Sequence, residues 1–521
     1  MLQTTGKAIG RSFRFIGKLK SETGPAAGQL HTLQQLLERA RETAFGKHYH
    51  FSRLLSQPDL FKGFTNEVPI HTYAAMRKGW WQRCLNGEQD VTWPGQVRYF
   101  ALSSGTSDAS SKHIPVTRDM IRSVRKVGLQ QIYSLLNFPI PSVTFRKGVL
   151  LLGSTTSLNA CNGYYEGDMS GISTIHLPSW VSRLYFKPGQ DIARQKGWQE
   201  RIARMVRDAE KWDIGMICGL PSWVQILLEE IIRHYRLKNI HELWPNLNVY
   251  IHGGVSFEHY RDSFNKLMGK PLTFIETYMA SEGSFGYQAR PGNHGIRLVL
   301  NAGVFFEFVP FTPANFDEEG EIKSGAHSCT IADVKEGMNY ALLLSTCAGA
   351  WRYLIGDVIR FTDVPACEIA IVGRTRQFLN LCGEHVSIDN INQAVKMTAE
   401  KLGVRIGEFA VTGIKHESLF AYRWYIGCDD PAINAEDISN ALDASLCAIN
   451  DDYQVERQAA IRSVSVKVYP DEAFHHYLQS INPGSAMMKF PRVLKNGALS
   501  TWEEYLEQIN LQPLSAFTSR D

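Results

Sequence analysis

The segment from Ser103 to Pro115, SSGTSDASSKHIP, places four hydroxyl side chains around Gly105 and a lysine shortly after them. Phosphate oxygens are bound by closely spaced backbone N–H groups and small hydroxyls, with a nearby cation to offset their charge. The segment therefore indicates a phosphate-binding loop. The Walker spacing, Gly-x4-Gly-Lys-Ser/Thr, is absent, which excludes a P-loop NTPase. Taken alone, the segment is equally compatible with a serine-rich surface loop.

A second segment with chemical potential is Thr277–Gly283, TYMASEG, directly after an apolar run. The aromatic ring of Tyr278 can stack on adenine. The carboxylate of Glu282, four residues later, can hold a magnesium ion that bridges phosphates. Taken alone, Tyr278 is more typical of a core residue.

A third segment, Tyr353–Phe361, reads YLIGDVIRF and places Asp357 behind a glycine at the edge of a strand. A carboxylate in this position can accept hydrogen bonds from both ribose hydroxyls, as acidic residues do in dinucleotide folds. Taken alone, Asp357 is more typical of a turn. The three segments together, in this order, specifically indicate a nucleotide site.

These three segments resemble the signature motifs of the adenylate-forming enzymes, and in particular of the acyl acid amido synthetases, the Gretchen Hagen three family, in its bacterial branch. The resemblance covers nearly the whole chain. Further matching segments are LPSW at 220–223, LWPNLNVYIHGGVSF at 243–257, GAWRYLIGD at 349–357, IVGRTRQFLNLCGEHVSIDN at 371–390 and MKFPR at 488–492.

The resemblance implies an ATP- and Mg²⁺-dependent ligase. Such an enzyme activates a carboxylic acid as an acyl adenylate and transfers the acyl group to an amine, with an amino acid as the expected acceptor. It also implies residue roles. The phosphates would be bound by a loop of Ser103, Ser104, Gly105, Thr106, Ser107 and Lys112, and also by Ser281. Adenine would lie against Gly253 and Gly254 and stack on Tyr278, and the ribose would be bound by Asp357 and Arg374. Glu282 would hold magnesium, and Lys489 would reach the α-phosphate.

Two positions depart from the family pattern. Ser110 stands where many bacterial relatives carry a second lysine, and His385 stands where relatives carry an acid or a lysine in the hinge segment. Both changes leave open a binding-only member that holds nucleotide without turnover. An acyl-CoA ligase is the other alternative, because it shares the first half-reaction and uses a thiol acceptor in the second.

Other chemistries find little support. No Gly-x-Ser-x-Gly segment occurs, so a serine hydrolase is not indicated. The histidine pairs His48/His50 and His475/His476 lack further ligands at metal spacing. The aromatic pair Trp80–Trp81 could line a pocket, but core packing is the simpler interpretation.

Composition agrees with a soluble globular protein. The 521 residues carry a net charge of +3, which gives no case for a nucleic-acid binder. Nine cysteines without a Cys-x-x-Cys pair indicate reduced thiols and a cytoplasmic location. No apolar run is long enough to span a membrane. The basic N-terminus, with Lys7, Arg11, Arg14, Lys18 and Lys20, is interpreted as a helix on the domain surface. The alternatives are an amphipathic helix in weak contact with a membrane surface and an organellar transit segment. A monomer is expected.

The elements that must position these motifs alternate in type. Strands are predicted at Gly148–Gly153, Asn248–His252, Leu272–Glu276, Gly303–Val309 and Tyr340–Ser345, and helices at Gly28–Phe45, Ile192–Trp212, Pro221–Arg236 and near Trp502–Gln508. This alternation predicts an α/β fold. A large N-terminal domain of mainly parallel sheets with flanking helices, residues 1–376, would precede a small mobile α+β C-terminal domain, residues 377–521. The hinge is expected at 373–385.

Overall fold

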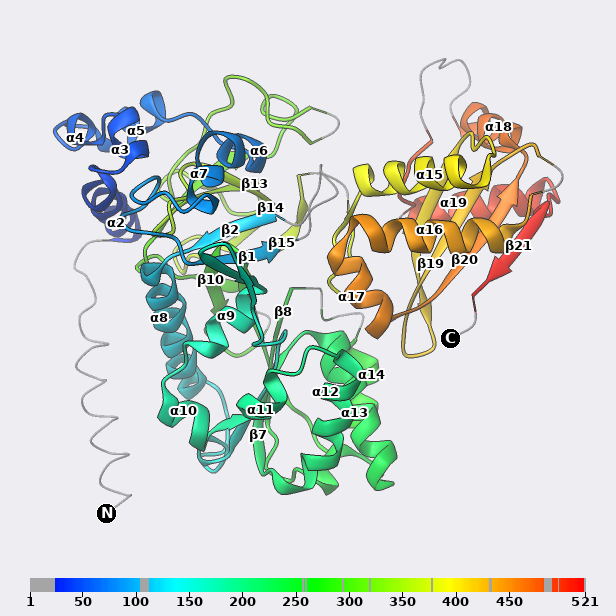
Figure 1. Ribbon diagram of the computed structural model, residues 1–521, viewed down its shortest axis with the longest axis horizontal. Helices are drawn as coiled ribbons and strands as arrows, with labels where there is room; N and C mark the ends of the chain where they lie inside the picture. The colour runs from blue at the N-terminus through cyan, green and yellow to red at the C-terminus, as the bar shows by residue number, and fades with distance from the viewer. Residues whose placement is uncertain are drawn as a thin grey trace.

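The computed structural model of the chain describes residues 24–103, 112–254, 257, 260–292, 295–317, 320–375, 378–430, 433–481, 490–494 and 496–519 (Figure 1). The basic N-terminal segment, with Lys7, Arg11, Arg14, Lys18 and Lys20, lies outside these residues. The described chain begins with helix α2 (Pro25–Ala40), which confirms the early start of the ordered fold. No helix of the described residues is long and apolar enough to cross a bilayer.

An eleven-stranded sheet forms the centre of the large domain. Its strands, in spatial order, are β12 (Val304–Pro310), β13 (Asn339–Thr346), β14 (Tyr353–Asp363), β15 (Glu368–Arg374), β11 (Ile296–Leu298), β10 (Gly283–Gln288), β9 (Thr273–Ala280), β8 (Val249–Gly253), β7 (Ile214–Gly219), β3 (Gly148–Leu152) and β6 (Phe186–Lys187). All five strands predicted from the sequence belong to this sheet.

The two halves of this sheet differ in strand direction. Strands β6, β3, β7, β8 and β9 pair in parallel, whereas the pairs from β9 through to β12 are antiparallel. The α/β class is therefore confirmed, but parallel pairing is restricted to one half of the sheet. The physical reason is the connections, because β9 and β10 follow each other through two residues, without the crossover that a parallel pair needs.

Helices cover the parallel half. Helix α13 (Pro221–Tyr235) was predicted correctly, and its buried side chains join a large apolar cluster with those of α12 (Trp198–Asp208). The single helix predicted over Ile192–Trp212 is wrong, since the segment forms α11 (Gln190–Ala193), α12 and the 3-10 turn η4 (Ala209–Lys211). Helix α11 ends at Ala193, with Arg194 as its C-cap, and Gly197 adopts an extended conformation as the N-cap of α12.

A second, four-stranded sheet lies beside the first. It contains β2 (Lys112–Val116), β1 (Tyr99–Ser103), β5 (Tyr164–Gly167) and β4 (Asn159–Cys161), in that spatial order. Strand β1 pairs antiparallel with β2 and in parallel with β5. The predicted phosphate loop is therefore the connection of the β1–β2 hairpin.

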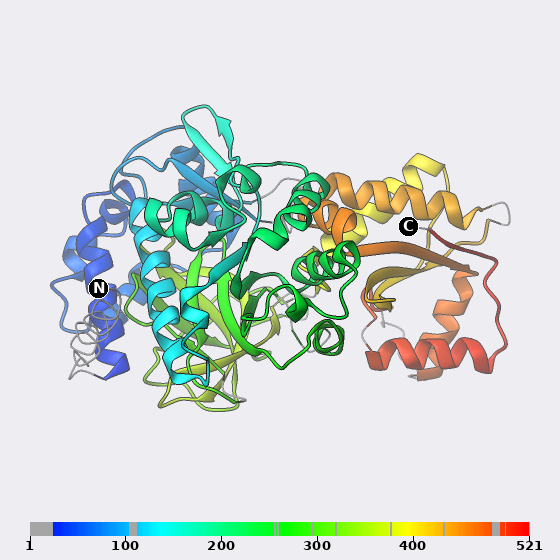
Figure 2. The same ribbon diagram turned by 90° about the horizontal axis from the view of Figure 1, so that it is seen from below.

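The small C-terminal domain is built on the four-stranded sheet β18 (Phe409–His416), β19 (Leu419–Gly427), β20 (Ile461–Tyr469) and β21 (Ser515–Thr518). Figure 2 shows helices on both faces of this sheet. One face carries α15 (Ile388–Leu402), α16 (Ala435–Ile449) and α17 (Asp451–Ala459); the other carries α18 (Asp471–Ile481) and α19 (Asn496–Gln508). The predicted α+β character is confirmed. The boundary between residues 376 and 377 stays a prediction, because both positions lie outside the described residues.

Candidate active site

The ends of β1 and β2 hold the predicted phosphate loop in place. Ser103 is the last residue of β1 and pairs with Lys112, the first residue of β2. The Lys112 ammonium lies 5.4 Å from the centroid of the Tyr73 ring. The Tyr73 hydroxyl in turn accepts a hydrogen bond of 2.9 Å from the backbone N–H of His113. The residues between the strands, including Ser104, Gly105, Thr106, Ser107 and Ser110, lie outside the described part of the chain.

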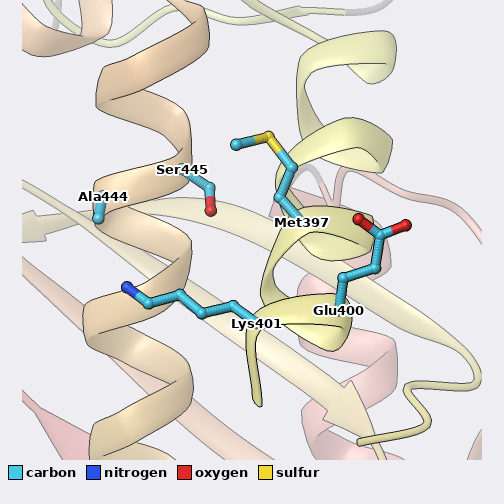
Figure 3. Close-up of a pocket in the computed structure, with 5 residues that line it drawn as sticks. All are labelled: Met397, Glu400, Lys401, Ala444 and Ser445. Carbon is cyan, nitrogen blue, oxygen red and sulfur yellow. The ribbon is translucent and has the colours of Figure 1, made fainter. Parts of the chain in front are cut away.

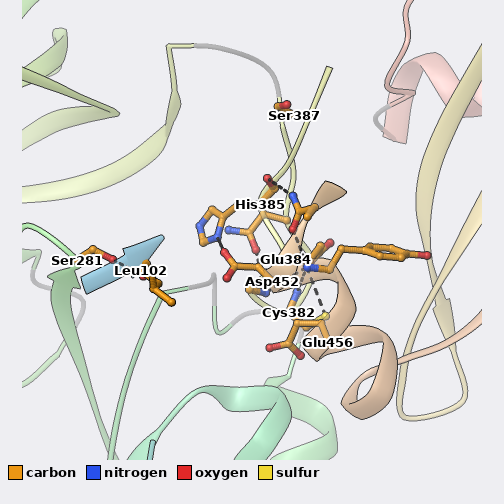
Figure 4. Close-up of polar contacts among 12 residues, drawn as sticks. Leu102, Ser281, Cys382, Glu384, His385, Ser387, Asp452 and Glu456 are labelled. Carbon is orange, nitrogen blue, oxygen red and sulfur yellow. Dashed lines mark hydrogen bonds and ion pairs between the residues drawn. The ribbon is translucent and has the colours of Figure 1, made fainter. Parts of the chain in front are cut away.

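The turn between β9 and β10 meets the end of β1. The Ser281 hydroxyl donates a hydrogen bond of 3.2 Å to the Leu102 carbonyl, one residue before Ser103 (Figure 4). Glu282, the next residue in this turn, is 8% exposed. Burial raises the pKa of the Glu282 carboxyl, and the Lys112 charge opposes this effect. Two predicted residues, Ser281 and Glu282, therefore lie close to the root of the phosphate loop, with Lys112 near the carboxylate.

The predicted ribose ligands form one buried cluster. Asp357 on β14 is opposite Arg374 on β15, and the Arg374 Nε lies 2.9 Å from Asp357 Oδ1. The Tyr278 hydroxyl donates a hydrogen bond of 2.5 Å to Asp357 Oδ2. Tyr278 lies near the end of β9, which places this cluster beside the β9–β10 turn.

Tyr278, the residue predicted to stack on adenine, lies in a buried position in this structure. The residue is only 4% exposed, and its ring packs edge-on against Phe285 at 5.1 Å. Burial, followed by the Asp357 carboxylate, raises the pKa of the Tyr278 hydroxyl well above its usual value. Tyr278 therefore remains a neutral hydrogen-bond donor, and its side chain orients Asp357. Its predicted stacking on adenine stays a prediction.

One further side chain of this cluster was missed by sequence reasoning. Tyr353 is 1% exposed, and burial together with a hydrogen bond to the Glu282 carboxylate raises the pKa of its hydroxyl. Tyr353, Ile355 and Asp357 alternate along β14 and are all buried. The period of two places Tyr353 and Asp357 on the same face of the strand. The alternation in YLIGD was the available signal.

The glycine pair at the end of β8 is held by tight packing. A side-chain carbon at Gly253 would lie 2.4 Å from the Thr277 carbonyl oxygen, and one at Gly254 would lie 2.8 Å from Leu220. Gly254 also has a φ of +83°, which favours glycine. Thr277 and Leu220 therefore occupy the space that a side chain at either glycine would need. Its predicted contact with adenine stays a prediction.

The described residues fit an ATP site with a magnesium ion. They bring together a cation next to the loop, Lys112, the buried Glu282 carboxylate, and the Asp357–Arg374 pair. Magnesium is usually held by one or two carboxylates and the phosphates of the substrate, and Glu282 supplies such a ligand. The carboxylate is already desolvated, so a bound cation would stabilise its ionised form.

The two remaining candidates belong to the small domain. Lys489 lies outside the described residues, so its predicted role at the α-phosphate stays a prediction. His385 has a φ of +41°, and its Nδ1 lies 3.6 Å from Oδ2 of Asp452 on α17. His385 therefore faces an acid within its own domain.

The small domain packs against α13 of the large domain. The indole N–H of Trp223 donates a hydrogen bond of 2.9 Å to Glu456 Oε1 across the interface. Glu456 is 2% exposed, and no hydrogen bond to its second oxygen is found among the described residues. Burial, and then the nearby Glu384 carboxylate, raise the pKa of Glu456 well above its usual value. Figure 4 shows Glu456 with Cys382 and Glu384 in this interface.

Backbone groups of the hinge segment also contact the large domain. The Tyr260 hydroxyl donates a hydrogen bond of 2.9 Å to the Leu381 carbonyl, and the Gln225 amide donates one of 2.9 Å to the Ser418 carbonyl. One apolar cluster continues across this contact from α13 into the sheet of the small domain. The observed arrangement is thus a packed one in which both domains share a core.

A surface groove of about 510 Å³ lies elsewhere, between α15 and α16 of the small domain. Figure 3 shows Met397 and Ser445 facing each other across it, with Lys401 extending along the gap. None of the predicted site residues lines this groove. We assign it no part in the chemistry.

Three family models match successive parts of the chain. The GH3 family N-terminal domain matches residues 19–207 and 213–273, the central domain matches 297–374, and the C-terminal domain matches 389–498. The chain belongs to the GH3 family. The resemblance drawn from the motifs is thereby confirmed. The N-terminal and central domains contain β1, β14 and β15, and the C-terminal domain contains α15 to α18.

The relatives of this GH3 protein include two Arabidopsis thaliana enzymes named indole-3-acetic acid-amido synthetases. GH3.4 is 22% identical over 78% of this chain and 76% of its own length. GH3.2 is 22% identical over 78% of this chain and 84% of its own length. Among solved structures, AtGH3.15 acyl acid amido synthetase in complex with 2,4-DB superposes with a TM-score of 0.58 at 18% identity, covering 97% of both chains. The structure of a 2-hydroxyisobutyryl-CoA ligase superposes with a TM-score of 0.58 at 14% identity, covering 93% of this chain and 92% of the ligase chain. These likenesses confirm the fold.

Proposed function

We propose that this GH3 protein is an ATP-dependent acyl acid amido synthetase, a ligase that forms a C–N bond through an acyl adenylate. The observation that carries the proposal is the convergence of three distant segments on one site. The ends of the β1–β2 hairpin, the turn with Ser281 and Glu282, and the Asp357–Arg374 pair lie together. The curated relatives named as indole-3-acetic acid-amido synthetases support the same activity.

In the first half-reaction, a carboxylate oxygen of the acid attacks the α-phosphorus of ATP. An O–P bond forms, the bond to pyrophosphate breaks, and acyl-AMP results. Lys112 offsets negative charge on the phosphates, while Asp357 accepts hydrogen bonds from the ribose and fixes the position of the nucleotide. Glu282 would hold magnesium, which neutralises phosphate charge when bound. The chain supplies alignment and electrostatic stabilisation and needs no covalent nucleophile.

In the second half-reaction, the nitrogen of an amine attacks the carbonyl carbon of the acyl adenylate. The C–N bond forms, the C–O bond to AMP breaks, and the nitrogen loses one proton. Rotation of the small domain about the segment 373–385 is expected between the two steps, as in other enzymes whose domains complete a site in turn. Lys489 would then act in the first step only.

An acyl-CoA ligase remains the second candidate, because a 2-hydroxyisobutyryl-CoA ligase shares the fold. The acceptor distinguishes the two, since the ligase uses a thiol and the synthetase uses an amine. We also expect a monomer in the cytoplasm. All nine cysteines are free, which is typical of proteins in a reducing compartment.

The test is ATP–pyrophosphate exchange over a panel of carboxylic acids that includes indole-3-acetic acid and 2,4-DB, followed by amide formation with amino acids or thioester formation with coenzyme A. At least one acid should support exchange, and amino acids should outperform coenzyme A. Asp357→Ala should lower the affinity for ATP roughly ten- to a hundredfold, because a charged hydrogen-bond acceptor is lost. If no acid supports pyrophosphate exchange and the protein does not bind ATP, the proposed enzymatic activity is refuted.

A further inference from the structure

Helix α8 (Arg118–Ser134) ends in a line of apolar side chains that point to solvent. Leu129 is 58% exposed and Ile132 is 55% exposed. Leu136, in the 3-10 turn η2 (Leu135–Asn137) that continues the helix, is 70% exposed, the highest value for a large apolar side chain in the described part of the chain. Single apolar residues on a surface are ordinary. These three, however, recur at intervals of three and four residues, so they lie along one side of the helix.

The opposite side of α8 packs into the large domain. Val127 belongs to an apolar cluster with Tyr287 and Val299, and Leu135 of η2 belongs to another with Val249 of β8. Figure 1 shows α8 on the outer side of the large domain, away from the small domain. The exposed apolar line is therefore not part of the interface between the two domains.

Basic side chains continue the same line toward the start of the helix. Arg118, Arg122 and Arg125 are exposed and precede Leu129 at intervals of four, three and four residues. They therefore lie on the same side of α8 as the apolar residues.

The segment that contains this line is basic as a whole. No acid occurs in the sequence from residue 120 to residue 165. Asp119, at the start of α8, accepts hydrogen bonds of 2.8 Å from Arg122 and 3.0 Å from the Trp93 indole. The exposed face of α8 is thus basic in its first half and apolar in its second.

A second basic and apolar segment precedes α2 on this side of the molecule. Gln29 of α2 donates a hydrogen bond of 2.7 Å to the Leu300 carbonyl, and Gln130 of α8 donates one of 3.1 Å to Asn301 Oδ1. Both helices contact one turn, so the described chain begins, at Gly24, close to α8. The residues before Gly24 lie outside the described part. Their sequence has no acid before Glu22 and carries Lys7, Arg11, Arg14, Lys18 and Lys20 among the apolar residues Ile9, Phe13 and Ile16.

Charge determines which partner fits the exposed face of α8. The N-terminal segment is a poor occupant, because two basic surfaces would meet. A second copy of the chain is a poor occupant as well. Pairing α8 with its copy sets arginines against arginines or against leucines, and a stable dimer buries roughly 800 Å² on each partner, more than these few side chains offer. A membrane that contains anionic lipids fits, because apolar side chains enter the acyl boundary while basic groups stay with the lipid phosphates.

We propose that the C-terminal end of α8 binds the surface of membranes that contain anionic phospholipids. Leu129, Ile132 and Leu136 enter the interface, and Arg118 and Arg125 contact the phosphates of the lipids. One weak signal gives only marginal membrane binding, so the basic segment before α2 supplies a second. The proposal is independent of the proposed function, since none of these side chains belongs to the candidate active site.

Co-sedimentation of the full chain with lipid vesicles tests the proposal. Vesicles of phosphatidylcholine alone are compared with vesicles in which a third of the lipid is phosphatidylserine. The parent should bind the anionic vesicles about tenfold more tightly or better, and added salt should weaken this binding. The triple variant Leu129→Gln, Ile132→Gln, Leu136→Gln should lose about tenfold in affinity for the anionic vesicles, because it has no apolar groups to insert. Arg118→Gln with Arg125→Gln should lose about tenfold and show a weaker dependence on salt.

The small domain supplies a matched control. Ile481, Ile509 and Leu514 are also exposed apolar residues, at 46%, 47% and 55%. The triple variant Ile481→Gln, Ile509→Gln, Leu514→Gln removes as many apolar side chains and should bind anionic vesicles as the parent does. All the substituted side chains are exposed, so each variant should keep the circular dichroism spectrum and the Tm of the parent.

Several results would overturn the proposal. A parent protein that ignores anionic vesicles, or that binds neutral ones equally well, would do so, as would unchanged binding in the Leu129, Ile132 and Leu136 variant. Loss of binding only on changing Ile9, Phe13 and Ile16 to Gln would assign the contact to the N-terminal segment alone. Sedimentation velocity without lipid covers the remaining case, because a dimer that the α8 variant abolishes would show that a second copy covers this face.

Discussion

The hydroxyl of Tyr278 donates a 2.5 Å hydrogen bond to Oδ2 of Asp357, joining two residues that lie 79 positions apart in the chain. Arg374 occupies the other oxygen of this carboxylate at 2.9 Å. Asp357 is 6% exposed, and Tyr278 and Arg374 hold its carboxylate from two sides in the absence of nucleotide. This preorganisation would lower the entropy cost of the ribose binding that we propose for Asp357.

This contact separates two roles for the tyrosine. If the hydroxyl orients Asp357, Tyr278→Phe should weaken ATP binding about tenfold or more, because a hydrogen bond to a charged group is worth about 1.5–3 kcal/mol. If the ring instead stacks on adenine, the same change should leave the affinity unaltered, because phenylalanine retains the ring. Calorimetric titration with a non-hydrolysable ATP analogue decides between them. Tyr477→Phe, in the core of the small domain, serves as the control.

The strand pattern and the motifs were sufficient to predict the α/β class and the five strands, and three of the residues they singled out meet around Asp357. The local contacts could not be predicted in the same way. The Tyr278–Asp357 bond depends on the order of β9, β10, β11, β15 and β14 in the sheet, which no short-range pattern specifies. The break at Gly197 was missed because the apolar period continues on both sides of it.

Arg352, within the GAWRYLIGD segment, holds the large domain together. Its guanidinium donates to Glu307 at 2.9 Å, to the Val68 carbonyl at 2.7 Å and to the Ser328 hydroxyl at 2.9 Å. The arginine and glutamate side chains are 5% and 0% exposed. Arg352→Met should lower the free energy of unfolding by about 3–5 kcal/mol, because it leaves the Glu307 charge buried and uncompensated.

Urea denaturation followed by circular dichroism measures this loss. Arg360→Met is the matched control, because Arg360 lies on β14, the strand that Arg352 directly precedes, and its exposed side chain bonds to Asn339. It should change stability by less than about 0.5 kcal/mol. A loss at Arg352 no larger than at Arg360 would show that the buried pair contributes nothing to stability.

Lys489 tests the two-step scheme from the small domain. Negative charge builds on the α-phosphate as ATP is attacked, so a cation there stabilises the transition state more than the ground state. Lys489→Ala should slow adenylation by about a hundredfold or more, yet convert synthetic acyl-AMP and amine to amide at nearly the parent rate. Single-turnover measurements of each step provide the comparison. Equal loss of both steps would contradict a lysine that leaves after the first.

The Trp223–Glu456 contact makes the domain interface sensitive to pH. Burial and the nearby Glu384 carboxylate raise the folded-state pKa of Glu456 above the unfolded value of about 4.5, with Asp452 adding to the effect. Between these two pKa values the folded chain binds more protons than the unfolded chain, so this group lowers stability as the pH rises through that window. Glu456→Gln retains an acceptor for the Trp223 indole but cannot ionise. The Tm of Glu456→Gln relative to the parent should therefore increase from pH 5 to pH 8, measured by differential scanning calorimetry.

Glu504→Gln, at an exposed position on α19, should show no such trend. A Tm difference for Glu456→Gln that stays constant over this range would mean that Glu456 is ionised in the interface, and that water or a cation stabilises its charge there.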